Sequence, residues 1–371
     1  MTPNEKAKER GVPPLPLREA GKTSGDKAVG KPPLGRHAFR PRNVVSFLLA
    51  LVVLFLVSRQ LLGVDWGQVW ASIREANGWL FALAFLVFYC SYPLRALRWK
   101  RLLNNIGYGG VAGQPTGQPI GQPIPSVLGL TRIMYLAWFA NCVTVARLGD
   151  VYRGYLLKRE AGVSFTATFG TVLTERLLDL VVLVAMVGVG VLVVFHGTLP
   201  PEVALPLLIG VIASVLGILG LLSVRRFRRT LDQLVPERFR AYYTSLEHGL
   251  VDSFHHLPLL VAYSVIGWLF EGTTLYLTAA AVGTPVSVAG ALVVALLGSL
   301  LTTVPFTPGG LGFTEAGLVL LLGWLGLDAS TAGAVTLLFR LINYWSIVVL
   351  GFALYIFHGF ARTRQGARGT S

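Results

Sequence analysis

Charge is scarce in this sequence: only 13% of the 371 residues are Asp, Glu, Lys or Arg, where a soluble domain carries about 25%. Hydrophobic residues make up 53% and form long continuous blocks. One oversized soluble core does not explain them, because single cores stop growing near ~250–300 residues. Since lipid admits only helices and closed barrels, and the blocks do not alternate, we expect an all-α, polytopic integral membrane helical bundle.

Cysteine is nearly absent as well, which excludes two kinds of site. Cys90 and Cys142 both lie in apolar stretches, so neither a disulfide framework nor a C-x-x-C metal motif is indicated. The triplet Gly21-Lys22-Thr23 lacks the glycine that a P-loop needs five residues earlier, where Pro16 stands. We therefore expect no cofactor, no metal and no ATP-driven step within this chain.

Acidic residues are fewer than basic ones, 18 against 32, and the excess indicates the orientation in the membrane. Positive charge gathers in the first 42 residues, at 95–101, at 225–229 and near the C-terminus. Cytoplasmic loops carry this bias, so we place both termini, 100–126 and 224–256 inside, and 63–77, 196–202 and 283–289 outside. The expected parts are a disordered basic cytoplasmic tail (1–42), a transmembrane domain (43–358, halves 43–195 and 203–357) and a basic C-terminal tail (359–371), all at the plasma (cytoplasmic) membrane.

Nine apolar segments follow the tail, and some are too short to cross. They are 44–62, 78–99, 127–146, 166–195, 203–223, 257–282, 286–304, 313–325 and 332–357. About 20 helical residues span the hydrocarbon, so 313–325 falls short. A full crossing by 127–146 would also leave Arg153 and Lys158 outside. We expect six full spans and two broken, re-entrant elements, with eight or nine crossing helices as the alternative.

The two halves match each other at an offset of 164 residues. Gly162 and Arg176 are 14 residues apart, as are Gly326 and Arg340, and a Thr-Val pair opens a helix break before each. Three crossings per half turn the second half upside down relative to the first. Inverted repeats with broken helices are typical of transporters that bind at the repeat interface.

Charged residues inside the spans are the candidates for function, because each costs roughly 2.5–3.5 kcal/mol to insert. One interpretation is a polar cavity for an anionic or zwitterionic head group; the other is a set of buried ion pairs that hold helices together. The sharpest helix break lies at Pro305–Gly312. The free backbone N–H groups at the start of the next half-helix, near Phe313 and Thr314, would favour an anion. The candidate residues are Arg147, Asp150, Arg153, Glu175, Arg176, Asp179, Glu271, Pro308, Gly309, Gly310, Glu315, Arg340 and Asn343.

Three stretches resemble the lysylphosphatidylglycerol synthase transmembrane (flippase-like) family. They are Arg147-Leu148-Gly149-Asp150-Val151-Tyr152-Arg153, then Thr174-Glu175-Arg176-Leu177-Leu178-Asp179, then Pro305-Phe306-Thr307-Pro308-Gly309-Gly310-Leu311-Gly312-Phe313-Thr314-Glu315 with Arg340 beyond. Asp150 stands where the family more often has Glu, and Ala146 where it often has Pro, so the first break is expected to be gentler.

The resemblance implies a lipid-translocating membrane domain over about residues 44–358. In two-domain synthases this module flips the aminoacylated lipid made by a second domain, which does not follow the last span here. We therefore do not expect lysyl-lipid synthesis, and the resemblance does not identify the lipid.

The sequence favours a translocase for a phospholipid or lipid-linked head group, not an enzyme, with membrane lipids as its partners. Arg147, Arg153, Arg176 and Arg340 would meet phosphate in one wet pocket shared by the halves. One alternative is a membrane-embedded lipid or glycan transferase that uses Asp150 and Asp179. Another is a non-transporting subunit of a separate lipid-modifying enzyme; a homo-oligomer is also possible.

Overall fold

The computed structural model describes residues 64–108, 124–144, 148–194, 201–227, 235–284, 286–302 and 308–368, and for 201–203, 206, 308 and 358–368 the backbone alone. All of them belong to one compact unit, Val45–Ser371. Three expectations fall largely or wholly outside these residues: the basic tail, the span at 44–62 and the placement of Arg147.

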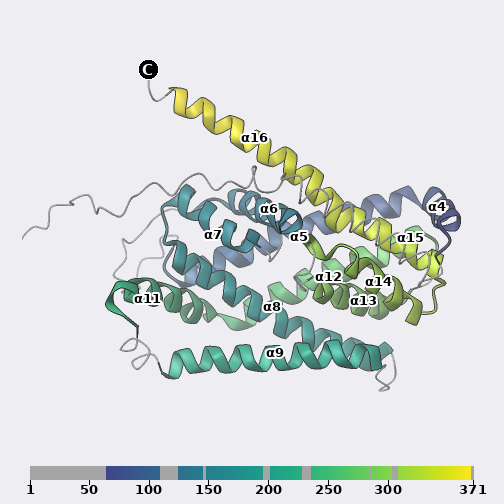
Figure 1. Ribbon diagram of the computed structural model, residues 1–371, viewed down its shortest axis with the longest axis horizontal. Helices are drawn as coiled ribbons and strands as arrows, with labels where there is room; N and C mark the ends of the chain where they lie inside the picture. Colours follow the sequence, from purple (N-terminus) through teal and green to yellow (C-terminus); the bar gives the residue numbers. More distant parts are fainter. Residues whose placement is uncertain are drawn as a thin grey trace, which may run out of the picture. The chain divides into compact units, whose positions relative to one another are not determined.

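The described residues form helices and the turns that join them, with no strand among them, which confirms the all-α prediction (Figure 1). The helices are α4 (Trp66–Glu75), α5 (Gly78–Asn105), α6 (Val127–Val143), α7 (Leu148–Ala161), α8 (Phe165–Val194), α9 (Pro201–Arg226), α11 (Glu237–Val251), α12 (Leu257–Ala281), α13 (Val288–Leu301), α14 (Phe313–Trp324), α15 (Ala329–Arg340) and α16 (Ser346–Arg368). Short 3₁₀ turns lie at Asp252–Phe254 (η2) and Pro308–Gly310 (η3), and a π-helical turn at Leu341–Trp345 (η4) joins α15 to α16.

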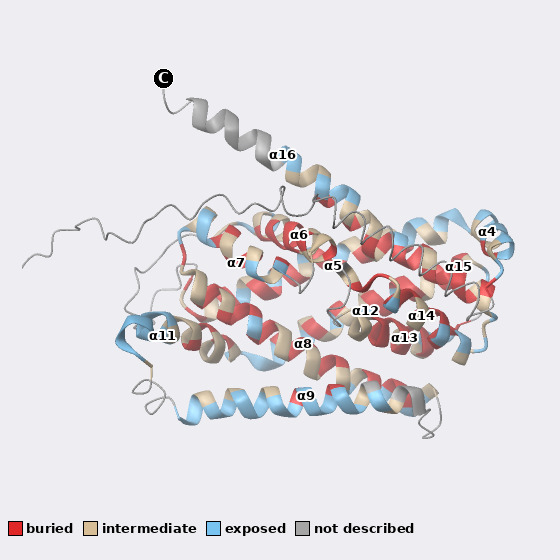
Figure 2. Cartoon of the chain, in the orientation of Figure 1, coloured by how far each residue is buried: buried red, intermediate tan, exposed pale blue. Residues whose placement is uncertain are grey.

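Five stretches in the described part are long and apolar enough to cross a membrane: α5, α8, most of α9, α12, and the run from α15 into α16. Only 11% of the most apolar 18-residue stretch of α9 is buried, and α9 is mostly pale blue, the colour of exposed residues, in Figure 2. Its exposed side chains include Leu208, Ile212, Leu216 and Leu219. Apolar side chains that are exposed along a whole helix are suited to lipid.

The short apolar helices α6, α13 and α14, together with the more polar α7, form two hairpins, α6–α7 and α13–α14, each of which enters and returns at the same end. Ser164, just after α7, donates its backbone N–H to the hydroxyl of Tyr108, just after α5. The C-terminal end of α7 therefore lies beside the C-terminal end of α5. At the other hairpin, a Cβ on Gly290 near the start of α13 would lie 2.9 Å from Leu325, just after α14. Figure 1 places α6–α7 and α13–α14 toward opposite ends of the long helices. These contacts agree with the two re-entrant elements that the sequence predicts.

Contacts between connecting segments also agree with the predicted grouping of loops. Asn105 donates to the carbonyl oxygens of Ser253 and His255, which joins two segments predicted to be inside. Asn77 donates its backbone N–H to the carbonyl of Ala281, at the end predicted to be outside. Which end faces the cytoplasm stays a prediction.

The segment 63–77, which the sequence predicts to lie outside, contains the helix α4. Asp65 caps α4 by accepting from the N–H groups of Gly67 and Gln68, and Val69 packs beside Ala334. With ten residues, α4 is too short to be recognised as a membrane span from hydropathy. The residues that pack against it, Ser330 and Ala334, lie more than 250 positions away in the sequence.

The internal repeat is visible in the positions of the charged side chains. Asp150 is the third residue of α7 and Glu315 the third of α14. Arg176 is the twelfth residue of α8 and Arg340 the twelfth of α15. The glycines that separate these helices have positive φ, 68° at Gly162 and 92° at Gly326. Each half therefore contains the same broken hairpin and following helix.

Candidate functional site

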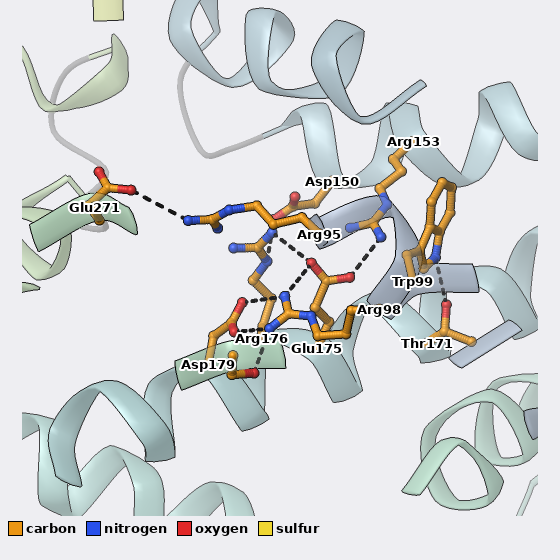
Figure 3. Close-up of polar contacts among 11 residues, drawn as sticks. Arg95, Arg98, Trp99, Asp150, Arg153, Thr171, Glu175, Arg176, Asp179 and Glu271 are labelled. Atoms are coloured by element: carbon orange, nitrogen blue, oxygen red, sulfur yellow. Dashed lines mark hydrogen bonds and ion pairs between the residues drawn. The ribbon is translucent and has the colours of Figure 1, made fainter. Parts of the chain in front are cut away.

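A group of six charged side chains, here called the central network, lies where α5, α7 and α8 meet (Figure 3). Arg98 of α5 is at its centre. It donates to both carboxylate oxygens of Asp179, one of them at 2.9 Å, and its Nη2 lies 2.9 Å from Glu175. The members are Arg98, Asp150, Arg153, Glu175, Arg176 and Asp179.

Arg153 of α7 is the second buried cation of the central network. Its Nη2 donates to Glu175 at 2.7 Å, and its guanidinium carbon lies 3.7 Å from the ring centroid of Trp99. Trp99 is fully buried and its indole N–H donates to Thr171 at 3.3 Å. A guanidinium on an indole face is a cation–π contact, which is strongest where water is excluded.

The third cation, Arg176, forms the outer edge of the central network. Its Nε is 3.5 Å from the carboxylate of Asp150. The two side chains are 28% and 17% exposed, whereas those of Arg98 and Glu175 are 2% and 1% exposed. The Asp150–Arg176 pair is thus long and partly exposed to solvent. It is the pair that the internal repeat relates to Glu315–Arg340.

Glu315–Arg340 at the second break is tight and closed. Arg340 donates through Nε to Glu315 at 2.6 Å and through Nη2 to the carbonyl of Gly309 at 3.1 Å. Glu315 also accepts the N–H of Gly312 at 2.6 Å, which caps the start of α14. Gly309 has φ 60°, and a Cβ there would lie 2.3 Å from the Tyr344 ring, so only glycine fits at this position.

A third ion pair, Arg95–Glu271, joins α5 to α12 and so the first half to the second. The two groups are 3.4 Å apart. The Arg95 guanidinium also lies 5.2 Å from the ring centroid of Trp138 and 5.6 Å from that of Trp268. Tyr92, one turn before Arg95, packs against Trp138 with ring centroids 6.0 Å apart.

Aromatic side chains connect this pair to the second break. Tyr92 packs on Tyr89 and Tyr135, and the hydroxyls of both hydrogen-bond to Ser346 of α16. Tyr344, which carries the Arg340 guanidinium on its ring at 4.5 Å, belongs to the same buried cluster. A belt of aromatic rings therefore lies between the Arg95–Glu271 pair and the Glu315–Arg340 pair at the second break.

The single pocket expected around Arg153, Arg176, Glu315 and Arg340 is wrong. Apart from the partly exposed pairs Arg132–Glu160 and His248–Asp252, the ion pairs of the described residues separate into the central network, Arg95–Glu271 and Glu315–Arg340. The reason is that each broken hairpin pairs its own carboxylate with the helix that follows it. Pro308 and Gly310 lie in η3, and Asn343 lies in η4, where its buried Oδ1 has no hydrogen-bond partner among the described residues.

Arg95, Arg98 and Trp99 belong to the site, although the sequence suggested orientation and anchoring roles for them. Their side chains are buried because α5 continues to Asn105, which places these residues well inside the helix. The spacing of Arg95 and Arg98, three residues apart on one face, was the available signal. Glu175 and Asp179 do share a face, as their spacing predicted, and both meet Arg98.

Comparison with known proteins gives one family and a set of membrane relatives. The family described as the lysylphosphatidylglycerol synthase TM region matches residues 43–351. A UPF0104 membrane protein of Methanocaldococcus jannaschii is 35% identical over 221 residues, which cover 58% of this chain and 93% of that protein. A UPF0104 membrane protein of Methanothermobacter thermautotrophicus is 24% identical over 303 residues, 76% of this chain and 84% of the relative.

One relative carries an enzyme name. Glycosyltransferase AglD of Haloferax volcanii is 26% identical over 312 residues, which cover 73% of this chain and 47% of AglD. The match therefore extends over about half of that longer protein.

Proposed function

The chain belongs to the lysylphosphatidylglycerol synthase transmembrane-region family, and we propose that it moves a phospholipid or lipid-linked head group between leaflets without ATP. The head group would pass between the repeat halves while the acyl chains stay in lipid. Its phosphate would take the place of a carboxylate on an arginine, and the released carboxylate would meet a cationic group or a proton.

Unused hydrogen-bond donors in the central network carry this proposal. The Nε–H groups of Arg98 and Arg153 are buried and have no hydrogen-bond partner in the part of the chain that the structure describes. Buried donors without acceptors are rare in folded proteins. A phosphate oxygen is the acceptor that a guanidinium binds best, so these donors are suited to a head group.

The difference between the two repeat-related pairs supports a transport cycle. Glu315–Arg340 is 2.6 Å apart and closed, whereas Asp150–Arg176 is 3.5 Å apart and partly exposed. Inverted halves that take unequal conformations give access from one side at a time. If Asp150–Arg176 closed while Glu315–Arg340 opened, access would shift to the other leaflet.

The geometry favours transport over the transferase alternative. Asp150 faces Arg176 and Asp179 faces Arg98, so neither carboxylate is free to act as a base. The relative named glycosyltransferase AglD, of which this chain covers 47%, adds sugar-bearing head groups to the substrates worth testing.

The test is leaflet exchange in vesicles that contain the purified chain and lipids labelled on an acyl chain. A membrane-impermeant reductant reads the outer-leaflet share of the label over time. We expect faster exchange than in protein-free vesicles, and a slower rate for Arg176→Gln, because Arg176 is partly exposed and its loss leaves Arg98 and Arg153 paired. Exchange no faster than in empty vesicles, across phospholipids and a lipid-linked sugar, would refute the function.

The same variant separates transport from the role of a passive subunit. A subunit whose charges only hold helices together would lose folded protein and would show no folded, slow form. Size-exclusion profiles and thermal unfolding of Arg176→Gln in detergent give the folded fraction for this comparison.

A further inference from the structure

The Arg95–Glu271 pair has the properties of a binding site that is occupied by the protein itself. The rings of Trp138 and Trp268 lie against the Arg95 guanidinium, Tyr92 packs on Trp138, and Glu271 lies 3.4 Å from the guanidinium. Aromatic faces with a carboxylate are the usual receptor for an ammonium ion. Here a side-chain cation holds the place of such a ligand.

Two buried donors at this site have nothing to bind. The Tyr92 hydroxyl and the Trp268 indole N–H have no hydrogen-bond partner among the described residues, and Tyr92 is 3% exposed. Trp268 contacts the Arg95 guanidinium directly, and Tyr92 packs on Trp138, which also contacts it. Since buried polar groups normally find partners, these two donors indicate room for an acceptor beside the guanidinium.

The Arg95–Glu271 pair is also the weakest closed contact of the buried ion pairs. Its 3.4 Å separation exceeds the 2.6–2.9 Å found for Arg340–Glu315, Arg153–Glu175 and Arg98–Glu175. Both side chains keep 9% of their surface exposed, against 1–2% for Arg153 and Glu175. A guest therefore displaces this pair more easily than the others.

We infer that the Arg95–Glu271 site receives the head group of a zwitterionic phospholipid, with phosphate on Arg95 and ammonium between Glu271, Trp138 and Trp268. The inference rests on the proposed function and names its substrate class. Charge balance decides between lipids. A zwitterion satisfies both members of the pair, whereas an anionic head group leaves Glu271 as an uncompensated buried charge, which is strongly unfavourable.

The experiment compares acyl-labelled phosphatidylethanolamine and phosphatidylglycerol in the leaflet-exchange assay. For the full chain we expect the ethanolamine lipid to move about tenfold faster, since each 1.36 kcal/mol of difference gives a factor of ten. Glu271→Gln leaves Arg95 as a lone cation and is expected to reverse the preference toward phosphatidylglycerol. Arg95→Gln is expected to slow both lipids.

Two variants outside the site serve as matched controls. Arg74→Gln removes an arginine that lies over the exposed Trp70 ring at 5.5 Å. Glu160→Gln removes a carboxylate that pairs with the partly exposed Arg132. Both are expected to keep the preference of the unaltered chain. If a single variant of the pair does not fold, the neutral double variant Arg95→Gln/Glu271→Gln replaces it and is expected to lose the preference.

The outcomes separate this inference from the proposed function. Equal rates for the two lipids, or a preference unchanged by Glu271→Gln or the double variant, overturn the zwitterion site while transport stands. If no lipid moves, transport fails, and short-chain phosphatidylethanolamine and phosphatidylglycerol are compared as stabilisers of the detergent-solubilised chain against heat. Equal stabilisation by both then overturns the site as well.

Discussion

Breaking the closed pair at the second helix break should destabilise the protein far more than breaking its repeat counterpart. Glu315→Gln leaves Arg340, which is 3% exposed, as a buried cation with no carboxylate and only the Gly309 carbonyl and the Tyr344 ring beside it among the described residues. Removing one member of such a pair costs about 3–5 kcal/mol. Asp150→Asn acts on a pair that is 3.5 Å apart with side chains 28% and 17% exposed, so after solvent screening we expect about 0–1 kcal/mol.

Thermal unfolding in detergent measures the contrast, because both variants replace a carboxylate by its amide at the third position of a half-helix. At about 2 °C per kcal/mol, Glu315→Gln should lower Tm by roughly 6–10 °C and Asp150→Asn by at most about 2 °C. The double variant Glu315→Gln/Arg340→Gln removes both charges and should recover much of the loss. Equal losses at the two positions, or a double variant that is worse than Glu315→Gln alone, would refute the assignment of one closed and one open pair.

Three further predictions concern packing, capping and the buried indole. Gly249→Ala should cost at least about 1–3 kcal/mol by overpacking, because its Cβ would lie 2.1 Å from the Ala167 carbonyl oxygen; Gly188→Ala, with nothing within 4 Å, is the control in the same Tm measurement. Asp328→Ala should cost about 0.5–2 kcal/mol, since it removes the N-cap of α15 with hydrogen bonds of 3.0 Å from Ser330 and Thr331. Those hydrogen bonds lower the pKa of Asp328 below 3.8, so its contribution is complete above that pH and is lost only as pH falls through the lowered value; a difference between the variant and the unaltered chain that disappears already at pH 6 would contradict this. Trp99→Leu should lower Tm more than Trp79→Leu, because Trp99 carries Arg153 on its ring whereas Trp79 is 87% exposed; equal shifts would show that the cation–π contact adds nothing.

Much of the membrane architecture could be predicted from the sequence because hydropathy and helix length are local properties. The segments 166–195 and 257–282 differ from α8 and α12 by only a residue at each end. The re-entrant element at 127–146 was predicted from the positive charge that follows this apolar block, and the one at 286–325 from the shortness of 313–325. The repeat could also be predicted, because Gly162 and Gly326 end helices with positive φ and the arginines follow at a fixed distance.

The pairing of the charges could not be predicted, because it depends on which helices lie side by side. Arg98 meets Asp179 across 81 positions and Arg95 meets Glu271 across 176. A charged residue near the end of an apolar block can either face the cytoplasm and set the orientation or lie buried in an ion pair. The sequence does not distinguish the two; in the structure α5 continues to Asn105, and Arg95 and Arg98 pair with residues of neighbouring helices. Amphipathic α4 was missed for a related reason: its buried side, Val69, is covered by Ala334.

The most direct test of lipid passage is a structure determined in a phosphatidylethanolamine bilayer. The account predicts a head group between α5 and α12, with its phosphate on Arg95, its ammonium at Glu271, and the Arg95–Glu271 pair separated. A structure in which that pair and the central network stay closed in every conformation, with lipid only along outer faces such as α9, would contradict it.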